Sequence, residues 1–434
     1  MSKNYISIWI NIMTRVISVS IESWSEFSIK DICINISSGG TPSRKVPEYY
    51  LNGVHKWIKT QELKDCNIYD TDEHITDAAL KNSSAKIYPK NTISMAMYGA
   101  TVGKLGIMKS ECATNQACCN MVVDSTKADY RFLFYSLLYR REELIGLASG
   151  AAQQNLNVGV ISNFRINLPT LSEQKAIAAT LSVLDDMIEL NNQINKTLEE
   201  MAQAIFKSWF VDFEPFKDGE SEESEIGLIP KGWKIVELEE ICSIQNGFAF
   251  KSSDYQDTGC RLIRTTNITS NGYVNNNDIK FLPQSFYESE KYKNYRFECF
   301  DTVLVMVGAS IGKIGLITEY NLPSLQNQNM WRFRANNREI SSVYIHYVVR
   351  RVNEFVSNWA TGSARDFYRK ESFQRAKCVL PPKNVMKEFR LLTDSLFIQI
   401  SSNIMENALL LEIRDILLPK LMSGEIRVPV EEVV

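Results

Sequence analysis

The sequence predicts an α+β protein in which two tandem-duplicated α/β domains are joined by two long helices that form an antiparallel coiled coil. Three observations lead to this prediction. Short motifs recur in the same order in both halves of the chain, each half ends in a long segment with an apolar heptad pattern, and an acidic stretch separates the halves. With 434 residues, 44% hydrophobic and 23% charged, the chain is long enough for two or three globular domains.

The duplication is visible as matched motifs whose separation drifts by only a few residues, as expected when loops gain or lose positions. The matched pairs are WSEFSIKDIC (24–33) with WKIVELEEIC (233–242), WIKT (57–60) with LIRT (262–265), YGATVGKLGI (98–107) with VGASIGKIGL (307–316), and ASGAAQ (148–153) with ATGSAR (360–365). The predicted boundaries are an extra or disordered N-terminal segment (1–21), a first domain (22–169), a central helix (170–213), an acidic linker (214–230), a second domain (231–382), a distal helix (383–428) and a tail (429–434).

The repeated YGATVGKLGI and VGASIGKIGL elements look like phosphate-binding loops but lack the required spacing. A Walker loop has four residues between its glycines and a Ser or Thr after the lysine. Here three residues intervene, and Leu105 or Ile314 follows the lysine. A short buried strand leads into each element, which indicates a structural glycine turn. The alternative is a turn that also touches a phosphate backbone.

Residues 172–210 contain neither Gly nor Pro and predict one long helix. Its apolar residues repeat at 4-3 spacing, and the same pattern recurs 212 residues later. This spacing is typical of a coiled-coil seam, and each helix would be about 55 Å long. Asn191 and Asn195 fall on the same seam positions as Asn403 and Asn407. Buried amides would fix the register of the helices on each other, because a slipped pairing leaves an amide unpaired.

The alternative is two independent amphipathic helices, each lying on its own domain, with asparagines that coincide by chance. If the helices pair antiparallel, the two domains lie at opposite ends with pseudo-twofold symmetry. A spacer made of two such helices would place the two domains on DNA half-sites about one helical turn, 34–36 Å, apart.

Charge is unevenly distributed, although the formal net charge is only −3. Residues 1–169 hold 18 Lys and Arg against 15 Asp and Glu, and residues 233–375 hold the same numbers. Residues 170–232 hold 5 against 13, and DGESEESEIG (218–227) is expected to be a solvated linker. Because the sign of the local charge matters more than the net charge for attracting a polyanion, two mildly basic segments are compatible with a nucleic-acid partner.

The sequence carries no motif for chemistry in this chain. Nine cysteines without CxxC spacing and three scattered histidines predict no metal site and a reduced, cytoplasmic environment. There is no [Asn/Asp]-Pro-Pro-[Tyr/Phe] or Phe-x-Gly-x-Gly stretch, and ELK (62–64) lacks the Pro-Asp half of a nuclease signature. We therefore expect no catalytic residues. The apolar N-terminus is broken by Asn11 and Arg15 and is not expected to cross a membrane; Met13 is an alternative first residue.

Two variable globular segments, each followed by a long helix, resemble the specificity (S) subunit of type I restriction–modification systems. The likeness is carried by SSGGTPSR…HKWIKTQEL, LPTLSEQKAIAATLSVLDDMIELNNQINKTLEEMAQAIFKSWF, IPKGWKIVELEEIC and LLPKLMSGEIRV, within residues 22–428. It implies that each globular segment is a target recognition domain for one half of a bipartite double-stranded DNA site. The helices would be the spacer and the docking surface for two modification (methyltransferase) subunits. S-adenosylmethionine, ATP and magnesium would belong to these and to the restriction (endonuclease/translocase) subunits.

Duplicated polar positions are the predicted DNA contacts. Asn and Gln amides pair bidentately with adenine in the major groove, whereas Lys contacts to phosphate position the protein without specifying sequence. Arg332 and Arg334 differ between the copies and are included because different half-sites demand different readers. A structural role, such as a capped turn or a buried amide, is the alternative for each residue. The predicted set is Arg44, Lys59, Thr60, Lys104, Asn115, Gln116, Lys251, Arg264, Thr265, Lys313, Asn327, Gln328, Arg332 and Arg334.

Two other functions are compatible with the sequence. One is a coiled-coil scaffold whose domains bind proteins instead of DNA, and the other is an enzyme whose active site follows no familiar motif. Salt-dependent binding of duplex DNA would favour recognition over the scaffold. Trp209, Phe210 and Phe213 form an apolar patch that predicts either core packing or partner docking.

Overall fold

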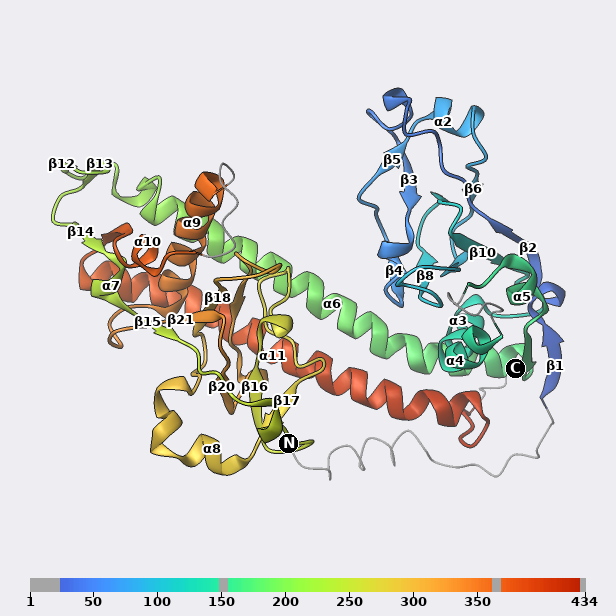
Figure 1. The fold of residues 1–434 in the computed structure, drawn as a ribbon. Coiled ribbons are helices and arrows are strands. Elements are labelled where there is room, and N and C mark those ends of the chain that lie inside the picture. The colour runs from blue at the N-terminus through green and yellow to red at the C-terminus, as the bar shows by residue number, and fades with distance from the viewer. Residues whose placement is uncertain (1–23, 148–154, 361–367, 430–434) are drawn as a thin grey trace. The chain divides into compact units, whose positions relative to one another are not determined.

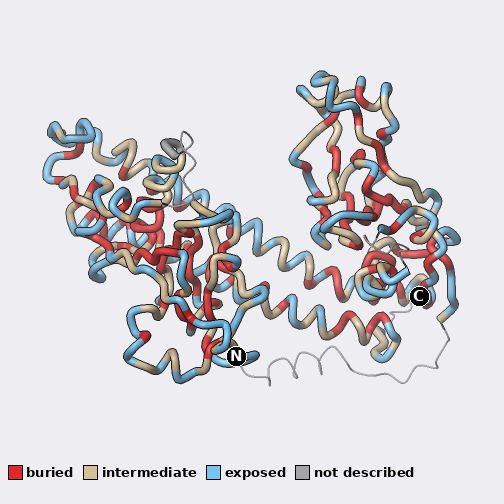
Figure 2. Tube along the Cα trace, in the orientation of Figure 1, coloured by how far each residue is buried: buried red, intermediate tan, exposed pale blue. Residues whose placement is uncertain are grey.

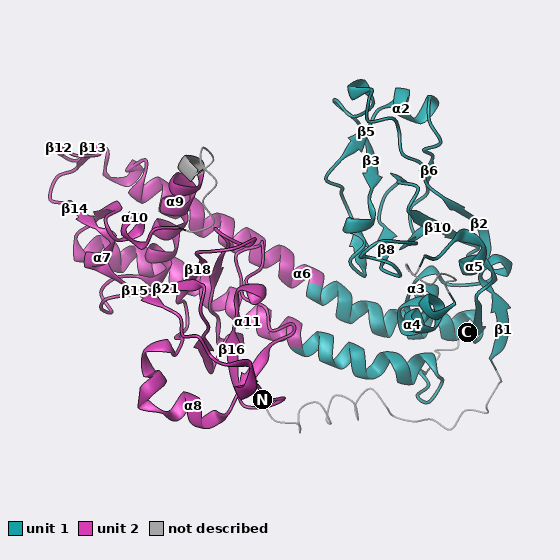
Figure 3. Ribbon diagram, in the orientation of Figure 1, with its two compact units in different colours: residues 1–188, 409–434 teal, residues 189–408 magenta. Residues whose placement is uncertain are grey.

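The computed structural model describes residues 24–147, 155–360 and 368–429, with side chains up to Ser357 in the second range. The predicted N-terminal segment and Met13 lie outside these residues. The chain divides into two compact units, residues 1–188 with 409–434 and residues 189–408 (Figures 1 and 3). Each unit contains one globular domain and one part of each long helix.

The first domain is built on a five-stranded mixed sheet of order β2-β10-β7-β8-β4 and a four-stranded sheet of order β5-β3-β9-β6. Strands β1 and β11 pair where the chain enters and leaves the domain. The strands are β1 (Ser25–Ser28), β2 (Cys33–Ser38), β3 (His55–Ile58), β4 (Cys66–Ile68), β5 (His74–Ile75), β6 (Ile87–Tyr88), β7 (Ile93–Ala96), β8 (Leu105–Met108), β9 (Cys112–Thr114), β10 (Cys118–Val123) and β11 (Arg165–Leu168). The helices are α2 (Asp77–Lys81), α3 (Tyr130–Tyr139), α4 (Arg141–Gly146) and α5 (Val158–Asn163), with short 3-10 turns η1 (Ile29–Asp31), η2 (Pro47–Tyr49) and η3 (Thr60–Glu62).

The second domain is built on a four-stranded sheet of order β15-β21-β18-β19 and a three-stranded sheet of order β17-β16-β20. Strands β14 and β22 pair at its entry and exit. The strands are β14 (Lys234–Glu237), β15 (Cys242–Asn246), β16 (Cys260–Ile263), β17 (Lys280–Leu282), β18 (Thr302–Val305), β19 (Ile314–Leu316), β20 (Ser324–Gln326), β21 (Met330–Ala335) and β22 (Lys377–Leu380). The helices are α7 (Leu238–Ile241), α8 (Gln284–Glu288), α9 (Ser342–Ala360) and α10 (Lys370–Gln374), with 3-10 turns η4 (Glu214–Phe216), η5 (Ser252–Asp254), η6 (Thr265–Asn267), η7 (Glu290–Tyr295) and η8 (Glu319–Asn321).

The two domains repeat the same strand order. The run β2-β10-β7-β8 of the first corresponds to β15-β21-β18-β19 of the second. Both contain a corresponding parallel pair, β3 with β9 and β16 with β20, and the first domain has a second parallel pair, β4 with β8. The entry and exit strands also correspond, since Ser25 pairs with Leu168 and Lys234 pairs with Leu380. The predicted tandem duplication is confirmed.

The repeated glycine element is a hairpin turn in both domains. The amide of Gly103 donates back to the preceding strand at 2.8 Å, and the amide of Gly312 does the same at 2.9 Å. The φ angles are 85° and 77° at Gly99 and Gly103, and 84° and 82° at Gly308 and Gly312. This left-handed region favours glycine because it has no Cβ. The turn geometry therefore accounts for the glycines without a nucleotide.

Helices α6 (Leu171–Phe210) and α11 (Lys383–Met422) form the predicted antiparallel pair. Within the second unit, Asn191 Nδ2 donates to Asn407 Oδ1 at 2.9 Å and Asn403 Nδ2 donates to Asn195 Oδ1 at 2.8 Å. As numbers on α6 rise, their partners on α11 fall, so the helices run in opposite directions. This pairing excludes two independent helices. At 1.5 Å per residue, 40 residues make each helix about 60 Å long.

Both long helices contain buried positions along their length (Figure 2), and the buried residues of the seam are polar as well as apolar. Asn195 is 8% exposed and Asn403 is 3% exposed. In the first unit, Leu181 and Leu184 of α6 belong to the same buried cluster as Leu417 of α11. The asparagines are therefore a polar interruption of an otherwise apolar seam.

Each domain is anchored to α6 by a carboxylate within its own unit. In the first, the Tyr135 hydroxyl donates to Asp185 at 2.6 Å, and Arg414 of α11 donates to the same carboxylate at 2.9 Å. In the second, Glu199 accepts from Arg350 at 2.7 Å and from the Tyr273 hydroxyl at 3.2 Å. Because these anchors are partly buried, they select how each domain lies on the helices.

The aromatic patch at the end of α6 is core. Phe210 is buried, and its ring centroid lies 4.9 Å from those of Tyr344 and Phe389. Phe213 and Trp209 extend the same cluster, with Phe213 5.6 Å from Trp233. Of the two alternatives for this patch, core packing explains Trp209, Phe210 and Phe213.

The acidic segment expected as a linker forms a small antiparallel hairpin. Strands β12 (Ser221–Ser224) and β13 (Gly227–Pro230) pair with each other alone. Glu222 and Glu223 are exposed, as expected for a solvated segment, while Ile229 is buried in the core of the second unit. No helix in the described part of the chain is long and apolar enough to cross a membrane.

Replacing Asn195 by Ala should lower the free energy of unfolding by about 1–3 kcal/mol, because the buried amide of Asn403 then loses its acceptor. The double variant Asn195→Leu/Asn403→Leu should recover stability, since two apolar seam residues leave no such donor. Urea unfolding measures both, with exposed Lys196→Ala as the control. Equal stability of the parent and Asn195→Ala would contradict the proposed importance of this bond.

Candidate nucleic-acid interface

Predicted contact residues of the first domain meet at the carboxyl ends of β3 and β9. Ile58 lies beside Thr114 in this parallel pair, so Lys59 and Asn115 emerge at the same edge. The backbone amide of Asn115 donates to the Ile58 carbonyl at 2.9 Å, which continues the strand pairing to this edge. We call this group the first strand-end cluster; its members are Arg44, Lys59, Thr60, Asn115 and Gln116. Their counterparts in the second domain form the second strand-end cluster.

The loop that carries Arg44 passes directly over this edge. The Gly40 amide donates to the Thr114 carbonyl at 2.9 Å, and the Trp57 indole donates to the Gly40 carbonyl at 3.1 Å. A Cβ on Gly39 would lie 2.2 Å from the Thr114 carbonyl oxygen, so only glycine allows this approach. Arg44 then stacks over Tyr50, with its guanidinium carbon 4.2 Å from the ring centroid.

Glu73 neutralises part of the first cluster. Its carboxylate lies 2.6 Å from the Arg44 guanidinium and 2.7 Å from the Lys59 ammonium. The hydrogen bond from Arg44, together with that from Lys59, lowers the pKa of Glu73, so the carboxylate is charged at neutral pH. Arg44 keeps a half-exposed side chain, whereas Lys59 is largely covered. A polyanion would therefore meet Arg44 more readily than Lys59.

The second cluster repeats the backbone of the first but not its charge. Arg264 and Asn327 follow β16 and β20, and the Asn327 amide donates to the Ile263 carbonyl at 3.1 Å. A Cβ on Gly247 would lie 1.7 Å from the Asn327 carbonyl oxygen, so this position also requires glycine, as does Gly39. The Arg264 guanidinium donates to the Asp278 carbonyl at 2.8 Å instead of to a carboxylate.

The remaining members of the second cluster are Thr265, Lys251 and Gln328. Thr265 begins η6, as Thr60 begins η3, and both are partly buried. Lys251 is exposed, and no acidic partner lies within ion-pair distance of it in the described ranges. The second cluster is therefore the more positive of the two.

The predicted amide readers divide into turn-capping and exposed residues. Asn115 Oδ1 accepts from the Ala117 amide at 3.1 Å, and Asn327 Oδ1 accepts from the Gln328 amide at 2.9 Å. These side-chain oxygens already accept backbone hydrogen bonds that stabilise the turn. Gln116 and Gln328 are exposed, so their amides are the better placed for bidentate contact with a base.

The two turn lysines have different surroundings. Lys104 lies 2.7 Å from Asp65, which also forms an ion pair with Arg141. Lys313 is exposed and pairs with no acidic side chain among the residues the structure describes. The pairing of Lys104 could not be predicted, because Asp65 lies outside the recurring motifs.

Arg332 is buried and Arg334 is partly buried in the second domain, and both side chains are already hydrogen-bonded there. Arg332 is 6% exposed, and its guanidinium donates to the carbonyls of Asn294 and Arg296 at 3.0 and 2.8 Å. Burial lowers its pKa to about 10, so it stays charged at neutral pH. Arg334 donates to buried Asp301 at 2.7 Å. Structural use explains both arginines in this conformation.

The structure also accounts for polar residues that suggest chemistry. Glu62, half of the incomplete nuclease signature, accepts from the backbone amides of Lys59 and Asp72 at 2.6 and 2.8 Å. His346 is buried against Thr302, and burial lowers its pKa to about 3, so its ring is neutral. Within the described ranges, no group of three or more His, Cys, Asp or Glu residues is arranged to hold a metal ion.

Both halves match one protein family, described as the type I restriction modification DNA specificity domain. The match covers residues 21–200 and 230–389, so the first copy includes the first domain and most of α6, and the second copy includes the second domain and only the start of α11. The chain belongs to this family. The repeated architecture is therefore a property of two specificity domains in one chain.

Relatives in this family are similar over more than half of the chain, and one of them over nearly all of it. The type I restriction enzyme MjaIX specificity subunit of Methanocaldococcus jannaschii is 26% identical over 420 residues, covering 94% of each chain. The HindI specificity subunit of Haemophilus influenzae is 25% identical and covers 61% of this chain and 70% of its own. The crystal structure of a type I restriction–modification S subunit from M. genitalium has a TM-score of 0.59 at 17% identity and covers 94% of this chain and 98% of its own. This last likeness supports the fold.

Replacing Arg332 by Met should lower the free energy of unfolding by about 1–3 kcal/mol, because the carbonyls of Asn294 and Arg296 lose a charged donor that is itself buried. Lys251→Ala, at an exposed position, should leave stability within about 0.5 kcal/mol of the parent and weaken duplex binding. Urea unfolding and fluorescence anisotropy with labelled DNA separate the two effects. A stable Arg332→Met protein with weakened DNA binding would contradict this assignment.

Proposed function

We propose that this chain is the DNA recognition subunit of a type I restriction–modification complex and has no catalytic activity of its own. Each globular domain reads one half of a bipartite site through its strand-end cluster, and α6 and α11 hold the readers apart. The observation that carries the proposal is the presence of a specificity domain in each half of the chain. The similar strand-end clusters, with different side chains and charges, suit a pair of readers for unlike half-sites.

Modification subunits are the proposed partners of the helix pair. Within the second unit, Leu190, Ile194 and Met201 of α6 are 56%, 38% and 49% exposed. On α11, Leu391, Ile398 and Met405 recur every seven residues and are 69%, 56% and 42% exposed. Apolar residues at helical spacing on a surface favour a partner helix that covers them. S-adenosylmethionine, ATP and magnesium are then expected on partner subunits, including the restriction subunits.

Exchanging residues 22–169 for the corresponding segment of another family member should change one half of the recognised site and leave the other half unchanged. Genome-wide mapping of methylated bases, in cells that carry the parent or the chimaera with the same modification subunits, measures this. Exchanging residues 231–382 should change the opposite half. If either exchange altered both halves, or neither half, the modular assignment would be wrong.

The double variant Ile194→Glu/Met201→Glu should weaken assembly with the modification subunits by at least about tenfold, because two carboxylates would have to be buried against an apolar partner. Co-purification and analytical ultracentrifugation measure assembly. Lys196→Glu, at an exposed polar position of the same helix, is the matched control. Unchanged assembly of a folded double variant would place the docking surface elsewhere.

A further inference from the structure

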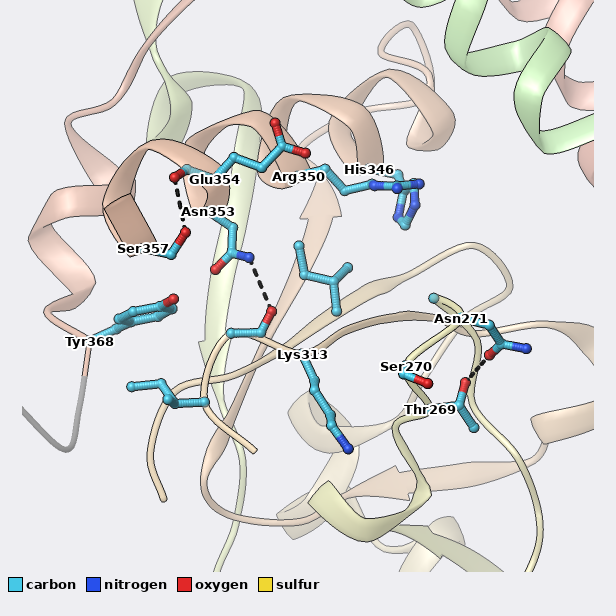
Figure 4. Close-up of a pocket in the computed structure, with 14 residues that line it drawn as sticks. Thr269, Ser270, Asn271, Lys313, His346, Arg350, Asn353, Glu354, Ser357 and Tyr368 are labelled. Atoms are coloured by element: carbon cyan, nitrogen blue, oxygen red, sulfur yellow. Dashed lines mark hydrogen bonds between the residues drawn. The ribbon is translucent and has the colours of Figure 1, made fainter. Parts of the chain in front are cut away.

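A polar cavity of about 600 Å³ lies in the second domain beside its glycine turn (Figure 4). Its wall is formed by the turn itself, by the loop Thr269–Gly272 and by the exposed side of α9 with Tyr368. Lys313 and Arg350 contribute positive charge, and among the described lining residues Glu354 is the acidic one. Arg350 is already paired with Glu199, whereas Lys313 forms no ion pair with a residue that the structure describes.

The first domain fills the corresponding place with a carboxylate. Asp65 accepts from the Lys104 ammonium at 2.7 Å and from the Leu105 amide at 3.0 Å, and it forms an ion pair with Arg141. Arg141 also donates to the Gly103 carbonyl at 3.0 Å, which ties the ion cluster to the turn.

The second domain keeps the donors of this arrangement and lacks the acceptor. Asn353 donates to the Gly312 carbonyl at 3.0 Å, as Arg141 does to Gly103. Lys313 and Ile314 occupy the positions of Lys104 and Leu105 in the repeated turn. Where the first domain has Lys64 and Asp65, the second has Thr269, Ser270 and Asn271, with no acidic side chain. The second domain therefore has no carboxylate in the loop that corresponds to the one carrying Asp65.

We propose that this cavity binds one phosphate of the DNA backbone, which takes the place of the Asp65 carboxylate. The inference rests on the proposed function. The Lys313 ammonium and the Ser270 hydroxyl supply donors, and a charged acceptor matches them better than a neutral one (Figure 4). Ser270 belongs to the loop that follows Thr265 of the strand-end cluster, so a duplex read by that cluster has its backbone nearby. The first domain makes no equivalent contact, because Asp65 already neutralises Lys104.

The test is the salt dependence of duplex binding by the full chain in complex with its modification subunits. For Lys313→Gln, the slope of log Kobs against log salt concentration should become less steep by about 0.9, the loss of one phosphate contact. Lys104→Gln, the matched control, should keep the parent slope. Ser270→Asp should behave like Lys313→Gln because it restores a carboxylate to the loop, whereas Ser270→Asn should keep the parent slope. Thermal unfolding verifies that each variant is folded.

The outcomes separate this inference from the proposed function. Equal slopes for the parent and Lys313→Gln, with sequence-specific binding intact, would overturn the phosphate site and leave the recognition role standing. Absence of salt-dependent duplex binding by the parent complex would overturn both. If inorganic phosphate raised the Tm of the parent but not of Lys313→Gln while the DNA slopes stayed equal, the cavity would be a site for free anions, and its proposed contact with DNA would be wrong.

Discussion

The hydrogen bond between the buried amides of Asn195 and Asn403 sets the register of α6 against α11, and both units depend on that register. Each unit is assembled from one globular domain and a part of both helices. A shift of one heptad would separate the amides from each other and leave them unpaired in an apolar seam. The same shift would separate Arg414 from Asp185. The polar residues therefore restrict the helices to one alignment, while the apolar residues supply most of the stabilisation.

Much of the fold follows from the sequence because the chain contains its own comparison. Motifs that recur in order predict two similar domains, and an uninterrupted heptad pattern predicts the helices. The predicted glycine turns follow from local backbone preferences, which a few residues determine. The sequence does not predict the small hairpin Ser221–Pro230, because its pairing depends on the burial of Ile229 in a core that includes residues distant in sequence.

The interface was less predictable, because partners of charged residues come from distant segments. Arg332 occupies the centre of β21, and its counterpart in the first domain is Asn120, which is also buried. Comparison of these two positions would have indicated a core role. No such signal existed for Glu73 or Asp65, whose partners are brought to them only by folding. A basic residue in a loop is thus weak evidence for a nucleic-acid contact until its acidic neighbours are known.

Asp185 and Glu199, the carboxylates that anchor the two domains, are both side chains of α6. Replacement of either domain would therefore have to preserve its contacts with both helices, since residues of α11 also pack in the core of each unit. An incoming domain that kept a tyrosine or arginine opposite the carboxylate of α6 would keep this anchor.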